Sequence, residues 1–450
     1  MTGEVGMIST QIDRLPTEFS FGVATSAYQI EGTSFGGCGR SHWDDFADQP
    51  GKTHQGQNGW IACDHYHRWA EDLDLVSAAG FDAYRFSFSW PRLLPEQDSQ
   101  ANPEGLAFYD ALIDGMLERG LTPFATLYHW DLPSGHADAG GWTNRQTALR
   151  FADYTDLVMR HFGDRLATVA PVNEPWCVSW LSYYWGAHAP GLNDIDATAK
   201  AMHYIQLAHG LSVEVMRGHG QTALGCVLNK EFGVAADNSL ETQNLTKLFD
   251  GIYNRWFEES IFNGRYPDDV LAVLGDHLPR DYQHDMATIS QPLDWAGVNY
   301  YTRSVIAPDE GEPHIGFKCI RGDLPKTDMG WEIAPEGLRF FLDRLASDYA
   351  PGLPIYITEN GMANADMLNG GQIKDASRIS YFADHLAGVA DLVEQGCPIK
   401  GYFAWSLLDN YEWAFGYDKR FGLVHVDYDT QKRTPKDSYL AWTDGLANKR

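Results

Sequence analysis

The chain has 450 residues with 34 basic and 61 acidic side chains, which gives a formal net charge of −27 at pH 7. This charge argues against a nucleic-acid partner, whose phosphates would be repelled, and less strongly against anionic membranes and phosphorylated substrates. No apolar stretch reaches the length of a membrane span, and the N-terminus lacks the apolar core of a signal peptide, so we expect a cytoplasmic protein with no membrane partner.

Length alone would allow about three domains, but barrel enzymes can exceed ~400 residues as one unit. No linker rich in Pro, Gly or Ser interrupts the chain, and the nearest candidate, residues 307–326, is predicted to be one long loop. We therefore predict a single catalytic domain over residues 1–450. The six cysteines form no C-x-x-C pair and are typical of free, mostly buried thiols.

Strand-like runs alternate with helical patterns along the chain. We predict strands at 19–26, 83–89, 123–128, 168–172, 223–228, 295–300, 355–358 and 402–406, and helices at 63–79, 105–119, 147–162, 197–217, 244–262, 334–347 and 377–395. Eight such alternations predict an α/β fold, the (β/α)8 or TIM barrel, with long loops after the strands. A doubly wound sheet is the alternative, but no G-x-G-x-x-G turn follows a strand.

Two of the predicted strands lead directly into a glutamate, in Asn173-Glu174-Pro175 and in Thr358-Glu359-Asn360-Gly361. A lone glutamate at a strand end is usually a solvated loop residue or an ion-pair partner. These two, however, would face each other nearly across the mouth of the barrel. Facing carboxylates are typical of glycosidases, in which one donates a proton to the leaving oxygen and the other attacks the anomeric carbon.

Polar and aromatic residues follow the other strands, and for each one alone a core or rim role is an equally good explanation. Together they would converge on one face of the barrel, where they could bind sugar hydroxyls or stack on sugar rings. They are Gln29, Arg85, His129, Trp130, Asn173, Asn299, Tyr301, Trp405, Glu412 and Trp413.

Seven segments resemble, in order, the motifs of glycoside hydrolase family 1, and the match is close to the family's bacterial β-glucosidases. The resemblance covers essentially the whole chain. The segments are Phe21 to Gly32 (FGVATSAYQIEG), Tyr84 to Ser87, Leu127 to Pro133, Asn173 to Pro175, Asn299 to Tyr301, Thr358 to Gly361 and Trp405 to Trp413 (WSLLDNYEW).

The resemblance implies a retaining mechanism with Glu174 as general acid/base and Glu359 as nucleophile. It places Arg85 and Tyr301 beside the nucleophile, where a cation and a phenol would lower the pKa of Glu359, while the pKa of Glu174 is raised. It also implies sugar contacts from Gln29, His129, Trp130, Asn173, Asn299, Tyr301, Trp405, Glu412 and Trp413, and a place for Trp331 on the aglycone side.

By the same resemblance, Trp176 and Leu181 border the aglycone side as an apolar gate, although ordinary helix packing explains Leu181 equally well. The implied substrates are cellobiose, short oligosaccharides and aryl or alkyl β-glucosides, with galactosides, fucosides and transglycosylation left open. The resemblance implies no cofactor. We also expect no metal, because His65 and His67 do not share a helix face. The oligomeric state, a homo-oligomer included, stays open.

One residue departs from the family pattern. Pro171 stands three residues before Glu174, where the family usually has Thr or Ser. Proline cannot donate a hydrogen bond to a strand ladder, and a closed barrel has no free edge. We therefore expect a bulge or a lost hydrogen bond at the end of the fourth strand.

Four other functions fit the residues at the strand ends less well. A 6-phospho-β-glucosidase would read phosphate with Ser and Lys after the eighth strand, where this chain has Glu412 and Trp413. Thioglucosidases replace the acid/base glutamate with glutamine, and a non-catalytic sugar-binding barrel would be expected to have lost one of the two glutamates. A Schiff-base aldolase needs a lysine inside the mouth, and Lys230, the nearest, is predicted to be a loop charge.

Overall fold

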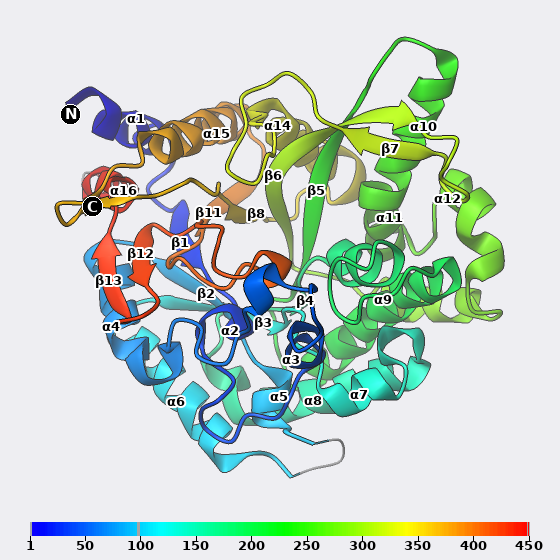
Figure 1. Cartoon of the computed structure of the whole chain (residues 1–450), viewed down its shortest axis with the longest axis horizontal. Helices are drawn as coiled ribbons and strands as arrows, with labels where there is room; N and C mark the ends of the chain where they lie inside the picture. The colour runs from blue at the N-terminus through cyan, green and yellow to red at the C-terminus, as the bar shows by residue number, and fades with distance from the viewer. Residues whose placement is uncertain (1, 97–99, 448, 450) are drawn as a thin grey trace.

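Eight parallel strands close into a barrel at the centre of the computed structural model, which describes residues 2–96, 100–447 and 449 (Figure 1). Neighbouring strands are hydrogen-bonded in the order β4-β3-β2-β1-β11-β8-β6-β5. This confirms the TIM barrel and excludes the doubly wound sheet. The barrel strands are β1 (Ser20–Ala24), β2 (Ala83–Ser87), β3 (Thr122–Tyr128), β4 (Thr168–Val172), β5 (Gly225–Ala235), β6 (Trp295–Pro308), β8 (Ile355–Asn360) and β11 (Ile399–Trp405).

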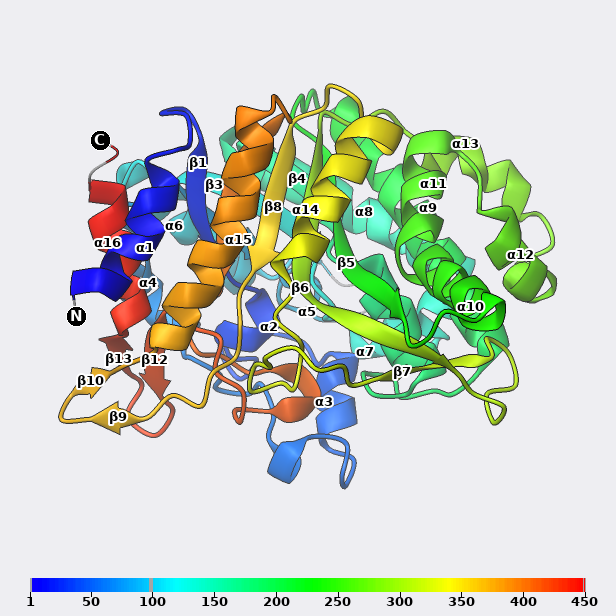
Figure 2. The same ribbon diagram turned by 90° about the horizontal axis from the view of Figure 1, so that it is seen from above.

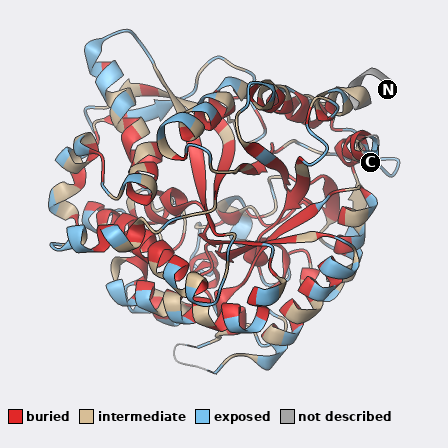
Figure 3. Cartoon of the chain, turned by 180° about the vertical axis from the view of Figure 1, so that it is seen from behind, coloured by how far each residue is buried: buried red, intermediate tan, exposed pale blue. Residues whose placement is uncertain are grey.

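Helices cover the outside of the barrel and bury the sides that face the strands (Figure 3). The main ones are α4 (His65–Ala78), α6 (Pro103–Glu118), α8 (Arg145–Phe162), α9 (Ile195–Gly218), α10 (Leu240–Asp250), α11 (Trp256–Asn263), α14 (Pro335–Arg344) and α15 (Ala376–Glu394). The Asn144 and Asp194 side chains cap α8 and α9 by accepting first-turn N–H groups. The single helix predicted at 244–262 is instead two, because a π-helical turn at residues 251–255 separates α10 from α11.

The remaining elements lie around this frame. Helix α1 (Thr2–Ile12) packs against α15 and α16 (Asp437–Ala447), so the two ends of the chain lie on the same side of the barrel (Figures 1 and 2). Two small hairpins, β9 (Leu368–Asn369) with β10 (Gln372–Ile373) and β12 (Val424–Asp427) with β13 (Lys432–Pro435), lie at one end of the molecule together with α2 (Ala27–Ile30) and α3 (His42–Ala47) (Figure 2). No helix of the described residues is both long and apolar enough to cross a membrane.

Large aromatic rings fill the interior of the barrel because the neighbouring strands carry glycine beside them. A Cβ on Gly225 would lie 2.2 Å from the Trp295 ring, and one on Gly22 would lie 2.4 Å from the Phe403 ring. Neither contact is possible without moving a buried ring. The glycines therefore make room for the rings, and the polar residues of the barrel gather at its carboxyl-terminal end.

The segment 307–326, predicted to be one long loop, is partly strand. β6 continues to Pro308, and β7 (Phe317–Ile320) pairs with it in antiparallel fashion. The buried Phe317 ring lies 5.8 Å from Phe249 of α10. A four-residue strand carries too little periodicity to be recognised in the sequence, and its partner decides its conformation.

The barrel closes irregularly between β4 and β5, as Pro171 predicted. Isolated bridges join Val169 to Leu224 and Asn173 to Val227. Between them β4 advances by four residues and β5 by three, so β4 carries one extra residue around Pro171. This confirms the predicted bulge, and the Glu174 N–H still reaches the Val227 carbonyl at 3.1 Å.

Candidate active site

A cavity of about 540 Å³ opens at the carboxyl ends of the barrel strands. Its wall is apolar on balance and includes a few carboxyl groups, Glu174 and Glu359 among them, which is the usual make-up of a small-ligand site. Of the residues that the sequence singled out, the wall contains His129, Trp130, Glu174, Trp176, Leu181, Tyr301, Trp331, Glu359, Trp405, Glu412 and Trp413.

Glu359 lies inside β8 and is held by two donors. Arg85 Nη1 donates to Oε1 at 2.5 Å, and the Tyr301 hydroxyl donates to Oε2 at 2.6 Å. Arg85 comes from β2 and Tyr301 from β6, so three strands fix one carboxylate. Two residues later, position 361 requires glycine because a Cβ there would lie 1.9 Å from the Trp405 carbonyl oxygen.

Glu174 follows β4 with a φ of 49°, in the left-handed region that non-glycine residues rarely adopt. Asn299 Nδ2 donates to its Oε1 at 2.7 Å, and the Cys177 thiol donates to its Oε2 at 3.1 Å. The side chain is buried, yet it lies on the cavity wall. This unusual backbone conformation directs a carboxyl group into the cavity.

Three residues behind the wall connect the two carboxylates. Asn173 Oδ1 accepts hydrogen bonds from Arg85 Nη2 at 2.7 Å and from Asn299 Nδ2 at 3.1 Å. Because Arg85 also binds Glu359 and Asn299 also binds Glu174, each carboxylate position depends on the other through rigid, buried groups. Asn173, Asn299 and Arg85 thus set the geometry of the site.

Burial dominates the electrostatics of both glutamates. It raises the pKa of Glu174 to about 8, with a further contribution from the charge of Glu359. It also raises the pKa of Glu359 above its ordinary value, although Arg85 and Tyr301 oppose the change. The prediction that these partners would lower the pKa of Glu359 below its ordinary value is wrong, because the loss of hydration outweighs them.

The loop after β11, residues 406–413, forms one side of the cavity. Gln29 Nε2 donates to Asn410 Oδ1 at 3.0 Å and lies 3.4 Å from Glu412 Oε2, while the Ser26 hydroxyl orients the Gln29 amide. Burial raises the pKa of Glu412 to about 8. An amide and a carboxyl group side by side offer both donors and acceptors to a polar ligand.

An aromatic surface lies beside these polar groups. The Trp130 and Trp413 rings are 4.7 Å apart, and the His129 and Trp405 rings stack at 5.8 Å with an interplanar angle of 17°. Burial lowers the pKa of His129 well below its ordinary value, so its imidazole is neutral. Flat apolar faces of this kind bind the C–H face of a ring-shaped ligand.

The cavity wall contains both residues of the predicted gate. Trp176 stacks on Tyr253 with ring centroids 3.9 Å apart, and Leu181 reaches the same wall from the π-helix Cys177–Tyr184. Trp331 also lies on this wall, with its ring centroid 5.7 Å from that of Tyr301.

Sequence reasoning missed several residues of this wall, in part because the predicted fifth strand ends at residue 228 and the predicted sixth strand at residue 300, whereas β6 continues to Pro308. β5 continues to Ala235. The polar residues after position 228 were the available signal. The missed wall residues include Cys177, Asn229, Glu231, Tyr253, Arg303 and Ser304.

Lys230, predicted to be a loop charge, is buried in β5. Its ammonium lies 2.8 Å from Glu258 Oε1, and both side chains are inaccessible to solvent. The prediction was wrong because the strand is longer than its apolar core, so that position 230 points into the helical layer. His65 and His67 have acidic partners, Asp72 and Asp64, and no cluster among the described residues could hold a metal ion.

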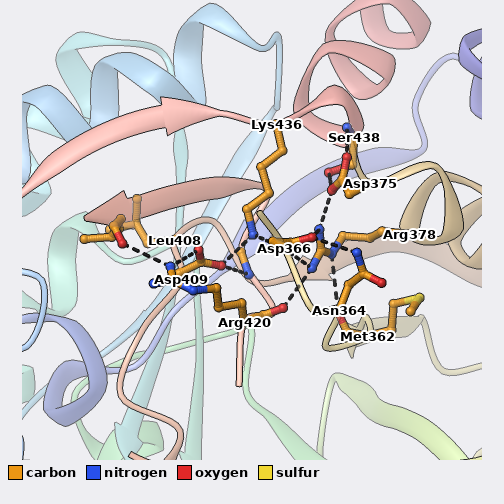
Figure 4. A network of polar contacts seen from close by, with 12 residues as sticks. Met362, Asn364, Asp366, Asp375, Arg378, Leu408, Asp409, Arg420, Lys436 and Ser438 are labelled. Carbon is orange, nitrogen blue, oxygen red and sulfur yellow. Dashed lines mark hydrogen bonds and ion pairs between the residues drawn. The ribbon is translucent and has the colours of Figure 1, made fainter. Parts of the chain in front are cut away.

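A buried ionic network supports the loop after β11, residues 406–413, from behind (Figure 4). Lys436 Nζ donates to Asp409 Oδ1 at 2.6 Å and to Asp366 Oδ2 at 2.5 Å. Arg420 also binds Asp409, Arg378 also binds Asp366, and Asp375 beside Arg378 brings the network to three carboxylates for three cations. Lys436 therefore ties the loop after β11, which carries Glu412, to the loop after β8.

Replacing Lys436 with Met is expected to lower the free energy of unfolding by about 3–5 kcal/mol, because two buried carboxylates lose their shared cation. Urea unfolding followed by tryptophan fluorescence measures the loss. Lys432→Met, which removes the exposed lysine that begins β13, is the matched control. Equal stability of the two variants would contradict this account of the network.

The arrangement can therefore carry two-carboxyl chemistry on a ring-shaped, hydroxylated ligand. One carboxyl group is protonated near neutral pH, the other is held by a cation and a phenol, and both face the same cavity.

Comparisons with known proteins identify the family. The family model described as glycosyl hydrolase family 1 matches residues 11–450. A β-glucosidase of Agrobacterium sp. is 45% identical, over 98% of this chain and 96% of the relative. A bifunctional β-D-glucosidase/β-D-fucosidase of Bifidobacterium breve is 40% identical, over 94% and 96%. The structure of a family 1 β-glucosidase from Thermotoga maritima in complex with isofagomine lactam is 42% identical, with a TM-score of 0.93 over 97% of this chain and 99% of that one. The chain belongs to glycosyl hydrolase family 1.

Proposed function

We propose that this glycoside hydrolase is a retaining β-glucosidase that releases terminal, non-reducing β-D-glucosyl residues from cellobiose, short oligosaccharides and aryl or alkyl β-glucosides. The observation that carries the proposal is the pair of buried carboxyl groups in different environments, Glu174 beside Asn299 and Cys177, and Glu359 beside Arg85 and Tyr301. The names of the relatives support the same activity.

In the first step, Glu359 attacks the anomeric carbon while Glu174 donates its proton to the leaving oxygen. Arg85 donates to one oxygen of the attacking carboxylate and Tyr301 to the other, so they orient the group and oppose the effect of burial on its pKa. The raised pKa of Glu174, about 8, keeps this group protonated at neutral pH.

In the second step, Glu174 is ionised and takes a proton from water, which attacks the glycosyl-enzyme. Loss of the negative charge on Glu359, once it is esterified, removes one cause of the raised pKa of Glu174. The same group can therefore act first as acid and then as base. An acceptor sugar in place of water would give transglycosylation.

The environment of Glu412 favours unphosphorylated sugars. Gln29 and Glu412 offer a donor and an acceptor to the glycone hydroxyls, whereas a carboxyl group here would repel a 6-phosphate once ionised. The Bifidobacterium relative, described as both a glucosidase and a fucosidase, supports a site that accepts more than one sugar.

A panel of p-nitrophenyl β-glycosides tests the function. The glucoside, galactoside and fucoside are assayed beside the glucoside 6-phosphate, with retention or inversion at the anomeric carbon read by NMR. We expect efficient glucoside hydrolysis with retention and negligible turnover of the 6-phosphate. Efficient hydrolysis of the phosphorylated substrate would favour the 6-phospho-β-glucosidase alternative, and no hydrolysis at all would favour a sugar-binding barrel.

The pH dependence of kcat/KM should be bell-shaped. Activity is expected to fall as pH rises through about 8, where Glu174 loses the proton that it must donate, and to fall in acid at a pH above the ordinary pKa of a glutamate, where Glu359 is neutralised. Burial also raises the pKa of Glu412 to about 8, so the variant Glu412→Gln is the control. The alkaline limb should survive in Glu412→Gln and disappear in Glu174→Gln assayed with a dinitrophenyl glucoside.

Truncating the gate should change the choice of substrate rather than the chemistry. Leu181→Ala and Trp176→Ala are expected to cost about 1–3 kcal/mol of aglycone binding each, the value of burying one large apolar side chain. The measurements are cellobiose against cellotetraose hydrolysis and inhibition by glucose. Leu192→Ala, which removes an exposed leucine of the loop between the π-helix Cys177–Tyr184 and α9, is the control. If the chain-length profile and the inhibition constant match those of the wild type, Trp176 and Leu181 are structural.

A further inference from the structure

The Cys177 thiol contacts the proposed acid/base directly. Its Sγ lies 3.1 Å from Glu174 Oε2, whereas Asn299 holds the other oxygen at 2.7 Å. Cys177 is the first residue of the π-helix Cys177–Tyr184, it is buried, and it also reaches the wall of the cavity. The carboxyl group is thus held between an amide on β6 and a thiol on the helix that follows β4.

We propose that Cys177 is a positioning residue for the acid/base step, and that its thiol holds Oε2 of Glu174 in the orientation that exchanges a proton with the leaving oxygen and with water. This inference rests on the proposed role of Glu174. The Cys177 thiol itself takes no part in bond making, and its contact is with the Glu174 carboxyl group.

A thiol suits this position because it is a weak donor. A carboxylate oxygen has two lone-pair sites, so one can accept the S–H while the other faces the substrate. Donation to the ionised carboxylate favours ionisation, and a strong donor here would leave too little of the protonated acid at neutral pH. Burial and the adjacent Glu174 raise the pKa of Cys177 well above its ordinary value, so the donor stays protonated throughout the working pH range.

The two steps of the reaction should respond differently to loss of this bond. Without the thiol, the ionised form of Glu174 is less stable, so Glu174 remains an acid but carries its proton to higher pH. Water activation needs the ionised form held in place, whereas cleavage of a dinitrophenyl glucoside needs little protonation. A residue that only stabilised the fold would affect both steps alike.

The experiment compares Cys177→Ala and Cys177→Val, which lack a donor, with Cys177→Ser, which keeps one. In the donor-free variants the alkaline limb of kcat/KM for p-nitrophenyl glucoside should move up by about half to one pH unit. For dinitrophenyl glucoside, kcat should fall about three- to tenfold while kcat/KM changes little. Cys177→Ser should return both quantities toward the wild type, and Cys226→Ser, a buried cysteine of β5 away from the cavity wall, should change neither.

Two results would overturn the inference. One is an alkaline limb that stays in place in the donor-free variants, and the other is a parallel loss of kcat and kcat/KM that Ser does not repair. The Val variant, close in size to cysteine, covers the case in which the Ala variant does not fold. If the alkaline limb of the kcat/KM profile instead survives in Glu174→Gln, Glu174 is not the acid/base. This outcome is independent of the Cys177 variants.

Discussion

Changing Glu359 to Gln is expected to abolish turnover, with a loss of several powers of ten in kcat, while binding of the sugar survives. The amide cannot attack the anomeric carbon, so the covalent step disappears. Its oxygen can still accept from Arg85, and the Tyr301 hydroxyl can turn to accept from the new NH2 group, so the shape of the site is kept. Calorimetric titration with glucose measures the binding that remains.

Azide separates a lost nucleophile from a damaged site. In Glu359→Gly the space left by the carboxylate admits azide, which should attack a dinitrophenyl β-glucoside from the opposite face and give the glycosyl azide of inverted configuration. Glu336→Gln, which alters a half-exposed glutamate at the start of α14, is the control and should hydrolyse normally. Near-normal hydrolysis by Glu359→Gln would remove Glu359 from the nucleophile role.

Glu174→Ala should have the second-largest effect, and its size should depend on the leaving group. Dinitrophenol leaves without protonation, so formation of the glycosyl-enzyme from the dinitrophenyl glucoside should be far less impaired than cleavage of cellobiose. The breakdown of the intermediate still needs a base and should become rate-limiting. Comparison of kcat/KM for the two substrates, with a burst of dinitrophenol, measures both effects.

Azide gives the opposite stereochemistry here. It needs no general base, so it should accelerate breakdown of the glycosyl-enzyme in Glu174→Ala and give the glycosyl azide of retained configuration. Retention in one variant and inversion in the other would together assign the two carboxylates to the two faces of the sugar. Equal damage to cellobiose and dinitrophenyl glucoside, without rescue, would mean that Glu174 is not the acid.

The parts of the fold that could be read from the sequence are local. The barrel strands are largely apolar runs, and the first seven are each followed by a helical pattern, so periodicity alone locates them. The bulge at Pro171 is also local, because proline lacks the N–H that a ladder requires. Two elements were not predicted from the sequence, β7 and the continuation of β6 to Pro308. They are stabilised by each other, and neither has enough residues to indicate a strand alone.

The site divides in the same way. Glu174 and Glu359 could be predicted because the barrel brings every strand end to one face, so that residues 185 positions apart in the chain share a cavity. The direction of the pKa shift of Glu359 could not be predicted from the sequence. It depends on the balance between burial and the Arg85 and Tyr301 contacts, and such a balance is set by distances and hydration rather than by residue type.

The family, the barrel and the two glutamates follow from local patterns, since motifs at strand ends and a repeated strand–helix pattern need no knowledge of distant contacts. The packing of separate segments sets which groups surround the glutamates. It buried Lys230 against Glu258, placed Lys436 between Asp366 and Asp409, and brought Cys177 to Glu174. A charged residue or a cysteine has the same letter in the sequence whether it is exposed or buried. Its partner and its desolvation are fixed only when separate segments pack together.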